Sequence, residues 1–251
     1  MDKNIESYNS AQVVNWYNNL HELLPVEKKV FELYSANLTN ASLLDIGIGG
    51  GRTTLFLLSR CKEYTGIDYS EKFVELCKKK FPEANILKED ARDLSLFKTN
   101  EFDFVNFSFN GIDYVSLSDR IKIISEVQRI LKPGGIFFFS SHNLKHSSFN
   151  KFPWQNGQDN LYTKFKTFVK LLPFVSRKFR HSKAELITRD YAIINDSAHN
   201  YSLLTFYSSP SFINQQLSDA GFGNINFYKK TGDKCSSENC DDWIFVTCEK
   251  A

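Results

Sequence analysis

Two patterns of apolar residues alternate along most of this chain. Short apolar runs have the length and the β-branched and aromatic content of buried strands. They begin near residues 43, 64, 86, 102 and 136. Between them, apolar residues recur at every third or fourth position, which is the spacing of an amphipathic helix. Strands that alternate with helices predict an α/β fold with a mostly parallel sheet.

Residues 1–40 are predicted to form helices that precede the first strand. Apolar residues follow one side of a helix from Val13 to Leu24, and Pro25 has the position of a helix start. Tyr8 and Tyr17 belong to this segment. Aromatic residues at helical spacing either pack in a core or contact a ligand, and the pattern leaves both possibilities open.

The segment 143–204 interrupts the alternation. Its periodicity fades, and lysines, arginines and aromatic residues gather in it. We interpret it as an insertion after the fifth strand, followed by a helix at 210–220 and two antiparallel strands at 224–229 and 243–248. The insertion is either a lid over a pocket for an anionic small molecule or a solvated helical segment that binds no ligand.

The composition excludes several classes of protein. A length of 251 residues suits one α/β domain with an insertion. A net charge of +2 argues against a bulk polyanion partner. The apolar runs are too short to span a bilayer, and the polar, acidic start of the chain does not resemble a signal peptide. We therefore expect a single domain over 1–251, a cytoplasmic location and no membrane partner.

Five cysteines are scattered at 61, 77, 235, 240 and 248. Cys235 and Cys240 lie close in sequence and near Asp241 and Asp242, but no second cysteine pair or nearby histidine completes a metal site. We expect no metal. An odd number of thiols in a cytoplasmic protein predicts that all of them are reduced and unpaired.

Residues 43–54 join an apolar strand to a helix through three alternating glycines. These are Gly47, Gly49 and Gly51. Glycine adopts positive φ and lets a flat ligand lie close to the backbone. A dinucleotide fingerprint needs glycine at position 52, which is arginine here. Asp45, at the end of the strand, would repel a pyrophosphate but suits a cationic, amino-bearing ligand. The alternative is a glycine-rich turn that binds no ligand.

Acidic residues also end the next two strands. Asp68 follows Asp45 at about the 20-residue distance at which the acid of a βαβ nucleotide site binds the ribose hydroxyls. A carboxylate can accept hydrogen bonds from both hydroxyls. The alternative is an acid at the start of a helix for which Ser70 is the expected N-cap. Asp90 follows the third strand.

The order and spacing of these elements resemble the class I S-adenosylmethionine (SAM) dependent methyltransferases, with motif I at 43–54 and a Pro-Gly-Gly turn at 133–135. The resemblance implies that family's Rossmann-like, doubly wound, seven-stranded sheet, mostly parallel with one antiparallel strand. It also implies a helical N-terminal cap at 1–40, a lid insertion over the acceptor site at 143–204, and SAM as the cofactor.

The resemblance assigns the cofactor contacts as well. Asp90 would bind the adenine amino group, and the backbone amide of Ala91 would bind the ring. Ser108 and Phe109, at the end of the fourth strand, would lie near the transferred methyl group. The full set of predicted cofactor residues is Asp45, Gly47, Gly49, Gly51, Asp68, Tyr69, Asp90, Ala91, Arg92, Ser108 and Phe109.

The family resemblance implies an enzyme that methylates an oxygen or nitrogen of a small metabolite or sugar. No Asp/Asn-Pro-Pro-Tyr motif follows the fourth strand, where the resembling nucleic-acid N-methyltransferases carry it, so nucleic acid is the less favoured acceptor. Basic residues in the insertion favour an anionic, phosphorylated or nucleotide-linked acceptor. They are Lys164, Lys166, Lys170, Arg177, Lys178 and Arg180. An RNA methyltransferase and a SAM-binding protein without turnover are the alternatives, and the sequence does not indicate an oligomeric state.

Three side chains are predicted to surround the acceptor. Asn110 follows the fourth strand, His142 follows the fifth, and His199 precedes the last helix. Ligands of open α/β sheets bind outside the carboxyl ends of the strands, which brings such residues together. A histidine would serve as the general base for a hydroxyl acceptor. An acceptor that is already anionic needs no base, and the histidines would then be structural.

Overall fold

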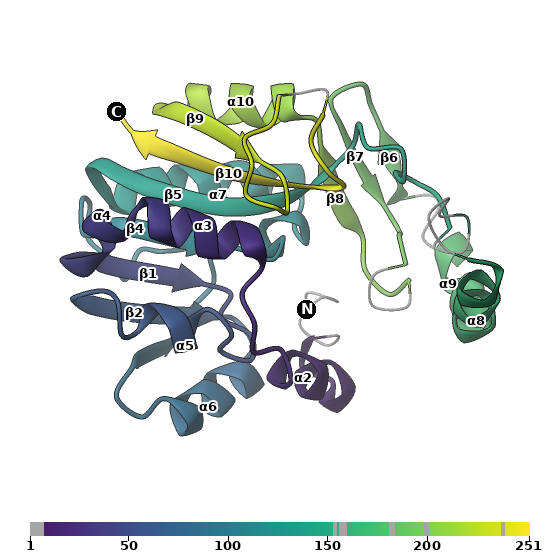
Figure 1. The fold of residues 1–251 in the computed structure, drawn as a ribbon, viewed down its shortest axis with the longest axis horizontal. Helices are drawn as coiled ribbons and strands as arrows, with labels where there is room; N and C mark the ends of the chain where they lie inside the picture. The colour runs from purple at the N-terminus through teal and green to yellow at the C-terminus, as the bar shows by residue number, and fades with distance from the viewer. Residues whose placement is uncertain (1–7, 153–154, 156–159, 181–183, 198–200, 237–238) are drawn as a thin grey trace.

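The computed structural model describes residues 8–152, 155, 160–180, 184–197, 201–236 and 239–251. Its strands are β1 (Ser42–Ile46), β2 (Glu63–Asp68), β3 (Asn85–Lys88), β4 (Phe102–Phe107), β5 (Leu131–Asn143), β6 (Leu186–Ile187), β7 (Tyr191–Ile194), β8 (Thr205–Ser208), β9 (Phe222–Tyr228) and β10 (Trp243–Lys250). They form one sheet in the order β3-β2-β1-β4-β5-β8-β7-β6, while β10 pairs with β5 and β9 (Figure 1).

The described helices are mostly short. They are α2 (Ala11–Asn18), α3 (Pro25–Leu33), α4 (Ser35–Thr39), α5 (Thr54–Leu57), α6 (Glu71–Lys80), α7 (Leu117–Ile130), α8 (Leu161–Leu171), α9 (Val175–Arg180) and α10 (Pro210–Asp219), with 3-10 turns η1 (Gly111–Asp113) and η3 (Leu172–Phe174). Pro25 begins α3, and Ser70 caps α6 by accepting a hydrogen bond from the Phe73 amide, both as predicted. In the described part of the chain, no helix has the length and apolarity to cross a bilayer.

The parallel half of the sheet confirms the predicted α/β fold. β1 pairs in parallel with β2 and β4, β2 pairs with β3, and β4 pairs with β5. Because these strands all run the same way, the loops that follow β1, β2, β3 and β4 emerge at one edge of the sheet. This edge carries the glycines and the acids that the sequence singled out.

The sheet has ten strands rather than the expected seven. The additional strands are β6, β7 and β8, which come from the end of the predicted insertion and the residues just after it. β8 runs parallel to the end of β5, and β7 runs antiparallel to β6 and β8, so β7 joins β10 as a second antiparallel strand. None of the three is longer than four residues, too short for a period-two pattern to stand out.

Side chains of the central strands fill a core on each face of the sheet. Along β5, Phe137 and Phe139 enter the core shared with α7 and α10, whereas Phe138 enters the core shared with α3 and α6. This alternation is the period of two that a strand imposes on its side chains. β4 is buried on both faces in the same way, as its apolar run predicts.

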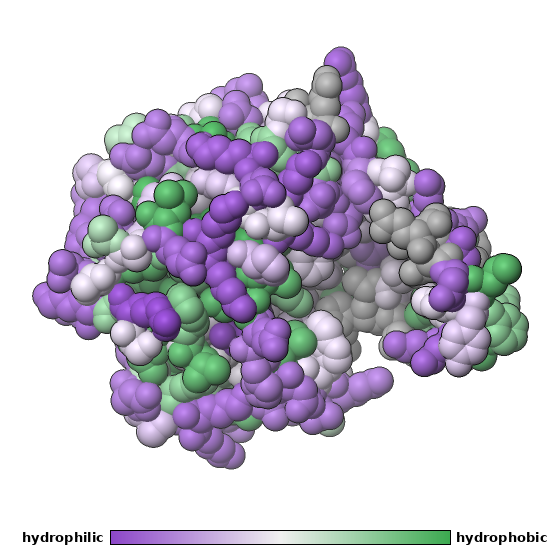
Figure 2. Space-filling model, in the orientation of Figure 1, coloured by the Kyte–Doolittle hydropathy of each residue, from purple (hydrophilic) through white to green (hydrophobic). Residues whose placement is uncertain are grey.

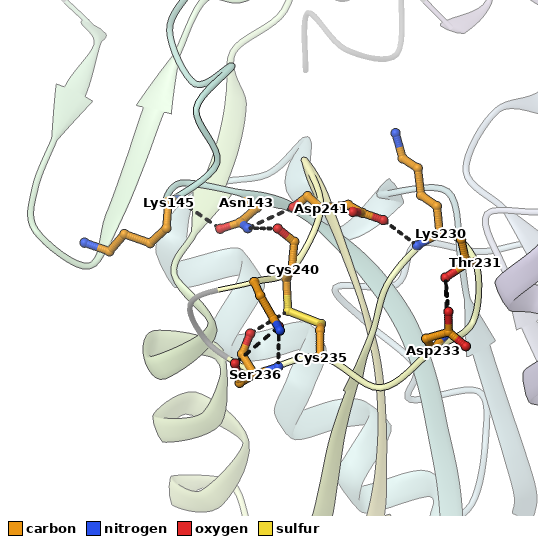
Figure 3. The surroundings of a disulfide bond; sticks show 10 residues. Asn143, Lys145, Lys230, Thr231, Asp233, Cys235, Ser236, Cys240 and Asp241 are labelled. Atoms are coloured by element: carbon orange, nitrogen blue, oxygen red, sulfur yellow. Dashed lines mark hydrogen bonds between the residues drawn. A yellow bond between two sulfur atoms is a disulfide. The ribbon is translucent and has the colours of Figure 1, made fainter.

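A disulfide links Cys235 to Cys240, and the prediction that all five cysteines are unpaired is therefore wrong (Figure 3). The loop between β9 and β10 doubles back, since the Cys235 amide donates to the Phe227 carbonyl of β9. This turn places the two Cα atoms 5.3 Å apart, within reach of a disulfide. Counting cysteines does not reveal such a fold of the backbone. Cys61, Cys77 and Cys248 are free thiols, as expected.

The glycine turn after β1 also receives the end of α2. Gly47, Gly49 and Gly51 have φ of 67°, 52° and 84°, so the predicted positive φ is confirmed. Gly50 is required for a different reason. A Cβ on it would lie 2.3 Å from the carbonyl oxygen of Tyr17, a backbone atom that cannot move aside without shifting the helix. The N-terminal helices are therefore packed directly on the turn.

We expect Gly50→Ala to lower the free energy of unfolding by about 1–3 kcal/mol, because the new methyl group overpacks the contact with α2. Gly223→Ala is the matched control, since its Cβ meets no atom within 4 Å. That control should change stability by no more than about 0.5 kcal/mol. Urea unfolding of both variants measures the difference, and equal stability would show that α2 does not press on the turn.

Candidate functional site

A cleft opens at the edge of the sheet where β1, β2, β3 and β4 end. Its space, open solvent at the mouth included, amounts to about 820 Å³. Its lining includes nine of the eleven predicted cofactor residues, namely Gly47, Gly49, Asp68, Tyr69, Asp90, Ala91, Arg92, Ser108 and Phe109. Tyr8 and Tyr17 of the N-terminal segment also line it. The fold therefore brings together residues that are spread over most of the parallel half.

Asp68 faces this cleft with a nearly buried carboxylate. Its two oxygens accept hydrogen bonds from the amides of Gly49 and Ser70, at 2.9 and 2.8 Å. Burial nevertheless raises the pKa of Asp68 to about 6, because the two amide donors only partly offset the loss of water. Each oxygen has a second lone pair, so the ionised group can still accept hydrogen bonds from a ligand in the cleft.

Arg92, two residues further along the chain, holds the carboxylate of Asp90 in place. Arg92 donates to it from the backbone amide and from the guanidinium, with Nη2 2.6 Å from Oδ2. Although burial by itself raises the pKa of Asp90, the hydrogen bonds from Arg92 bring it below its usual value. The carboxylate is thus ionised and oriented at the wall of the cleft, and its predicted contact with an adenine stays a prediction.

Asp45 does not line the cleft itself but a smaller pocket beside it, which shares Gly49 and Phe109 with the cleft, and its predicted contact with a ligand stays a prediction. Its carboxylate accepts hydrogen bonds from Thr53 Oγ1, Tyr64 OH and Asn106 Nδ2, at 2.7, 2.8 and 2.6 Å, and the residue is 1% exposed. Burial raises its pKa, and these three donors oppose the rise. The structure therefore places Asp45 in an internal network beside the turn. Gly51, likewise absent from the cleft lining, faces Phe81 and Cys77.

The loop after β4 turns sharply at the far wall of the cleft. Phe109 and Asn110 both have positive φ, at 64° and 60°, which is rare for residues other than glycine. The Asn110 amide donates to Ser140 Oγ of β5 at 2.8 Å, which holds the turn against the neighbouring strand. The Arg52 guanidinium lies 4.8 Å from the centre of the Phe109 ring. Two consecutive residues with positive φ thus lie in the loop that the family resemblance assigns to the transferred methyl group, and that assignment stays a prediction.

His142 lies behind this loop in a chain of buried polar groups. Its Nδ1 is 2.8 Å from Asp113 Oδ2, and its Nε2 is 3.3 Å from Asn110 Nδ2. Since an ionised carboxylate only accepts hydrogen bonds, Nδ1 carries the proton of the neutral ring and Nε2 is the basic nitrogen. Two of the three predicted acceptor residues, Asn110 and His142, are thus in contact. His199 lies outside the described residues.

Asp113 and Arg120 complete this chain, and the sequence analysis missed both. Arg120 Nη1 is 2.6 Å from Asp113 Oδ1, and both side chains are fully buried. Burial lowers the pKa of Arg120, while Asp113 opposes that change and keeps the guanidinium charged. A signal was present in the sequence: Arg120 lies at helical spacing from the buried Ile123 and Val127, on the apolar side of α7.

A second, polar cavity lies beyond His142, and its space, open solvent included, amounts to about 1890 Å³. The imidazole packs against Tyr114 of the cleft and Tyr207 of this cavity, with ring centres 6.3 and 5.0 Å away. Among the four lysines proposed to face the acceptor, whose side chains the structure describes, Lys178 alone lines either space. Lys166 and Lys170 are exposed on α8.

Comparison with known proteins identifies what the chain is similar to. Residues 44–139 match the family model described as a methyltransferase domain. An uncharacterized methyltransferase of Synechocystis sp. is 34% identical over 44% of this chain, and the chain spans about half (53%) of that relative. A demethylmenaquinone methyltransferase of Lactiplantibacillus plantarum is 26% identical over 76% of this chain and 74% of its own length.

The whole fold also has a solved counterpart. A SAM-dependent methyltransferase of Thermotoga maritima, described as a possible histamine N-methyltransferase, superposes with a TM-score of 0.61. The match covers 99% of both chains at 17% identity. At that identity the similarity concerns the fold, and it extends over the N-terminal helices and the segment between β5 and α10.

We expect Asp113→Asn to lower the free energy of unfolding by about 3–5 kcal/mol, because it leaves the Arg120 charge buried without a counter-ion. Glu71→Gln is the control, since it breaks the pair with Lys88, in which both side chains are more than half exposed. That loss should cost at most about 1 kcal/mol. Chemical denaturation compares the two variants. Similar losses would show that Arg120 finds another partner or that the buried site is hydrated.

Proposed function

We propose that the protein methylates an oxygen or nitrogen of a small molecule, with SAM as the methyl donor. The premise is that residues 44–139 match a methyltransferase-domain family model and that the chain has the fold of the class I SAM-dependent methyltransferases. The observation that supports this most is the cleft, where the nearly buried Asp68 carboxylate and the glycine turn after β1 lie along one edge of the sheet. His142 lies behind the loop that forms the far wall of this cleft. Location in the cytoplasm stays a prediction from the sequence.

The described residues fit a bound SAM. Asp68 would accept the ribose hydroxyls, and Asp90 with the Ala91 amide would take the adenine. The indication from this structure is the nearly buried Asp68 carboxylate, which faces the cleft and keeps a lone pair on each oxygen beside the two backbone amides that it binds. When bound, SAM supplies an already activated methyl group. The protein then has mainly to position the acceptor and exclude water.

His142 is the residue we propose to remove a proton from a hydroxyl acceptor. Its Nε2 is the unprotonated nitrogen, because Asp113 holds the proton on Nδ1. In this state the Asn110 amide donates to Nε2, and an acceptor hydroxyl would take its place. As the proton moves to Nε2 the ring becomes positively charged, and the buried Asp113 carboxylate stabilises that charge. Asp113 thus acts through His142 and is a positioning residue.

The acceptor we propose is anionic and enters through the second cavity. Three acids line that cavity, but each has an internal partner. Asp196 accepts from Tyr207 OH, Asp241 accepts from the Lys230 amide, and Asp242 is 2.7 Å from Lys230 Nζ.

Two lysines of the same cavity supply the positive charge. Within the described residues, Lys178 donates to two neutral oxygens, those of Asn150 and Asn195. Neither Lys178 nor Lys151 forms an ion pair with any described residue. A phosphate or carboxylate of the acceptor would satisfy them. Turnover on a pool of phosphorylated metabolites supports this proposal, whereas binding of structured RNA at physiological salt in gel-shift assays contradicts it.

We expect the affinity for S-adenosylhomocysteine, the demethylated product, to rise with pH through about 6. Below the raised pKa of Asp68 the carboxyl group is protonated and loses an acceptor site, and above it the carboxylate is ionised. Binding at pH 5 should be about tenfold weaker than at pH 7.5, since one pKa unit corresponds to a factor of ten. Calorimetry measures this. Asp68→Asn should bind weakly at both pH values, and Asp93→Asn, an exposed control, should follow the wild type.

We expect His142→Gln to lower turnover by roughly 10²-fold or more while the affinity for S-adenosylhomocysteine is unchanged, because the general base is lost and the cleft is not. His199→Gln tests the other predicted histidine in the same assay, and the exposed His21→Gln is the control. Near-normal turnover by both His142→Gln and His199→Gln would mean that the acceptor needs no base. Loss of product binding by His142→Gln would instead assign the histidine a structural role.

A further inference from the structure

Helix α8 carries a continuous apolar face that is turned away from the rest of the protein. Leu161, Phe165, Phe168 and Leu172 follow one another at i, i+4, i+7 and i+11, which is one side of a helix continued into η3. They are 87%, 66%, 37% and 53% exposed. Tyr162 and Val169 widen the same face and are 75% and 51% exposed.

The opposite side of α8 makes the contacts with the protein. Leu171 is buried, and Thr167 lines the second cavity. α8 and α9 lie at the far end of the molecule, beyond the β6–β7 hairpin, and apolar side chains gather at that end in the space-filling view (Figures 1 and 2). The cavity and the apolar face therefore use different sides of one helix, and the cavity does not account for the exposed face.

The charge around α8 has a single sign. Between Asn160 and Ala184 the sequence contains seven lysines and arginines and no aspartate or glutamate. The rest of the chain carries 24 basic and 29 acidic residues, so positive charge is concentrated in this segment. On the helix, Lys164 and Lys166 flank the apolar face on its two sides.

We propose that α8 lies in the surface of an anionic lipid bilayer, with its apolar face among the upper acyl chains and its lysines at the lipid phosphates. A basic amphipathic helix with aromatic and leucine side chains on one face is the form that interfacial helices take. Lysines at the border of the face extend their ammonium groups to the headgroups while their methylene stems stay in the apolar layer. The contact needs no helix that crosses the membrane, and it replaces the expectation of no membrane partner, which rested on the lack of a spanning segment.

Two other occupants fit these observations less well. RNA would use the positive charge and stack on Tyr162, Phe165 and Phe168, but it offers nothing to Leu161, Val169 and Leu172. A protein partner would have to provide an apolar groove for the face and acidic residues for the lysines beside it. The convex face of a single projecting helix, bordered by cations on both sides, matches an extended anionic surface better.

Cosedimentation of the full chain with vesicles tests this proposal. We expect binding to phosphatidylcholine vesicles that contain one quarter phosphatidylglycerol, little binding to pure phosphatidylcholine, and weaker binding at high salt. The double substitution Leu161→Ser with Phe165→Ser should weaken binding by at least about tenfold, because two large apolar side chains leave the acyl layer. Lys164→Gln with Lys166→Gln should weaken it about 30-fold, since each lysine near an anionic surface contributes about fivefold.

Matched controls are available on other surfaces of the protein. Leu96→Ser changes a leucine that is 58% exposed, and Lys78→Gln with Lys79→Gln changes two exposed lysines of α6. Both controls should bind vesicles like the wild type, and circular dichroism checks that all variants are folded. Failure of the wild type to bind anionic vesicles overturns the proposal, as does unchanged binding by both α8 variants. Self-association or RNA binding that depends on Phe165, without vesicle binding, overturns it in favour of those occupants.

Discussion

The buried carboxylate of Asp45 holds together the elements that shape the cleft. It lies at the end of β1 and accepts hydrogen bonds from Asn106 on β4, Tyr64 on β2 and Thr53 at the start of α5. Removing a carboxylate from water is costly, and the raised pKa of Asp45 reflects that cost. The three donors offset it only when both neighbouring strands and the turn are in register. This requirement favours one arrangement of the glycine turn.

Arg52 extends the same anchoring to the N-terminal helices. Its guanidinium pairs with Glu27, a fully buried acid in the first turn of α3, at 2.8 Å between Nη2 and Oε1. The same group lies over Phe109, at the other side of the turn. A dinucleotide site has glycine at this position, to allow close packing of helix and strand. Here Arg52 links the turn to the N-terminal helices and to the loop after β4. These segments therefore form the outer wall of the cleft.

In the chain of polar groups behind the cleft, each buried charge likewise requires a partner. Asp113 and Arg120 are both removed from water, and neither charge would be tolerated without the other. Asp113 also accepts hydrogen bonds from Ser141 Oγ and from the backbone amide of His142, so β5 fixes the orientation of its carboxylate. The direction of its remaining interaction, toward His142 Nδ1, is therefore set before any ligand binds. Preorganisation of this kind is what the proposed role of His142 as a base requires.

The sequence by itself determined the features that depend on neighbours in the chain. The five parallel strands, the positive φ of Gly47, Gly49 and Gly51, and the Ser70 cap follow from local periodicity and from backbone sterics. The positions of Asp68 and Asp90 at one edge follow from the parallel order of their strands.

Only the tertiary structure decided the features that depend on residues distant in the sequence. β8 exists because the end of β5 offers it a partner, and Cys235 meets Cys240 because the loop after β9 folds back. Asp113 and Arg120 are buried because β5 covers them, and the apolar face of α8 is exposed because the rest of the chain packs against its other side. Such contacts join segments that are distant in the sequence, and the local pattern of one segment does not indicate which other segment it will contact. Periodicity and composition therefore do not predict them.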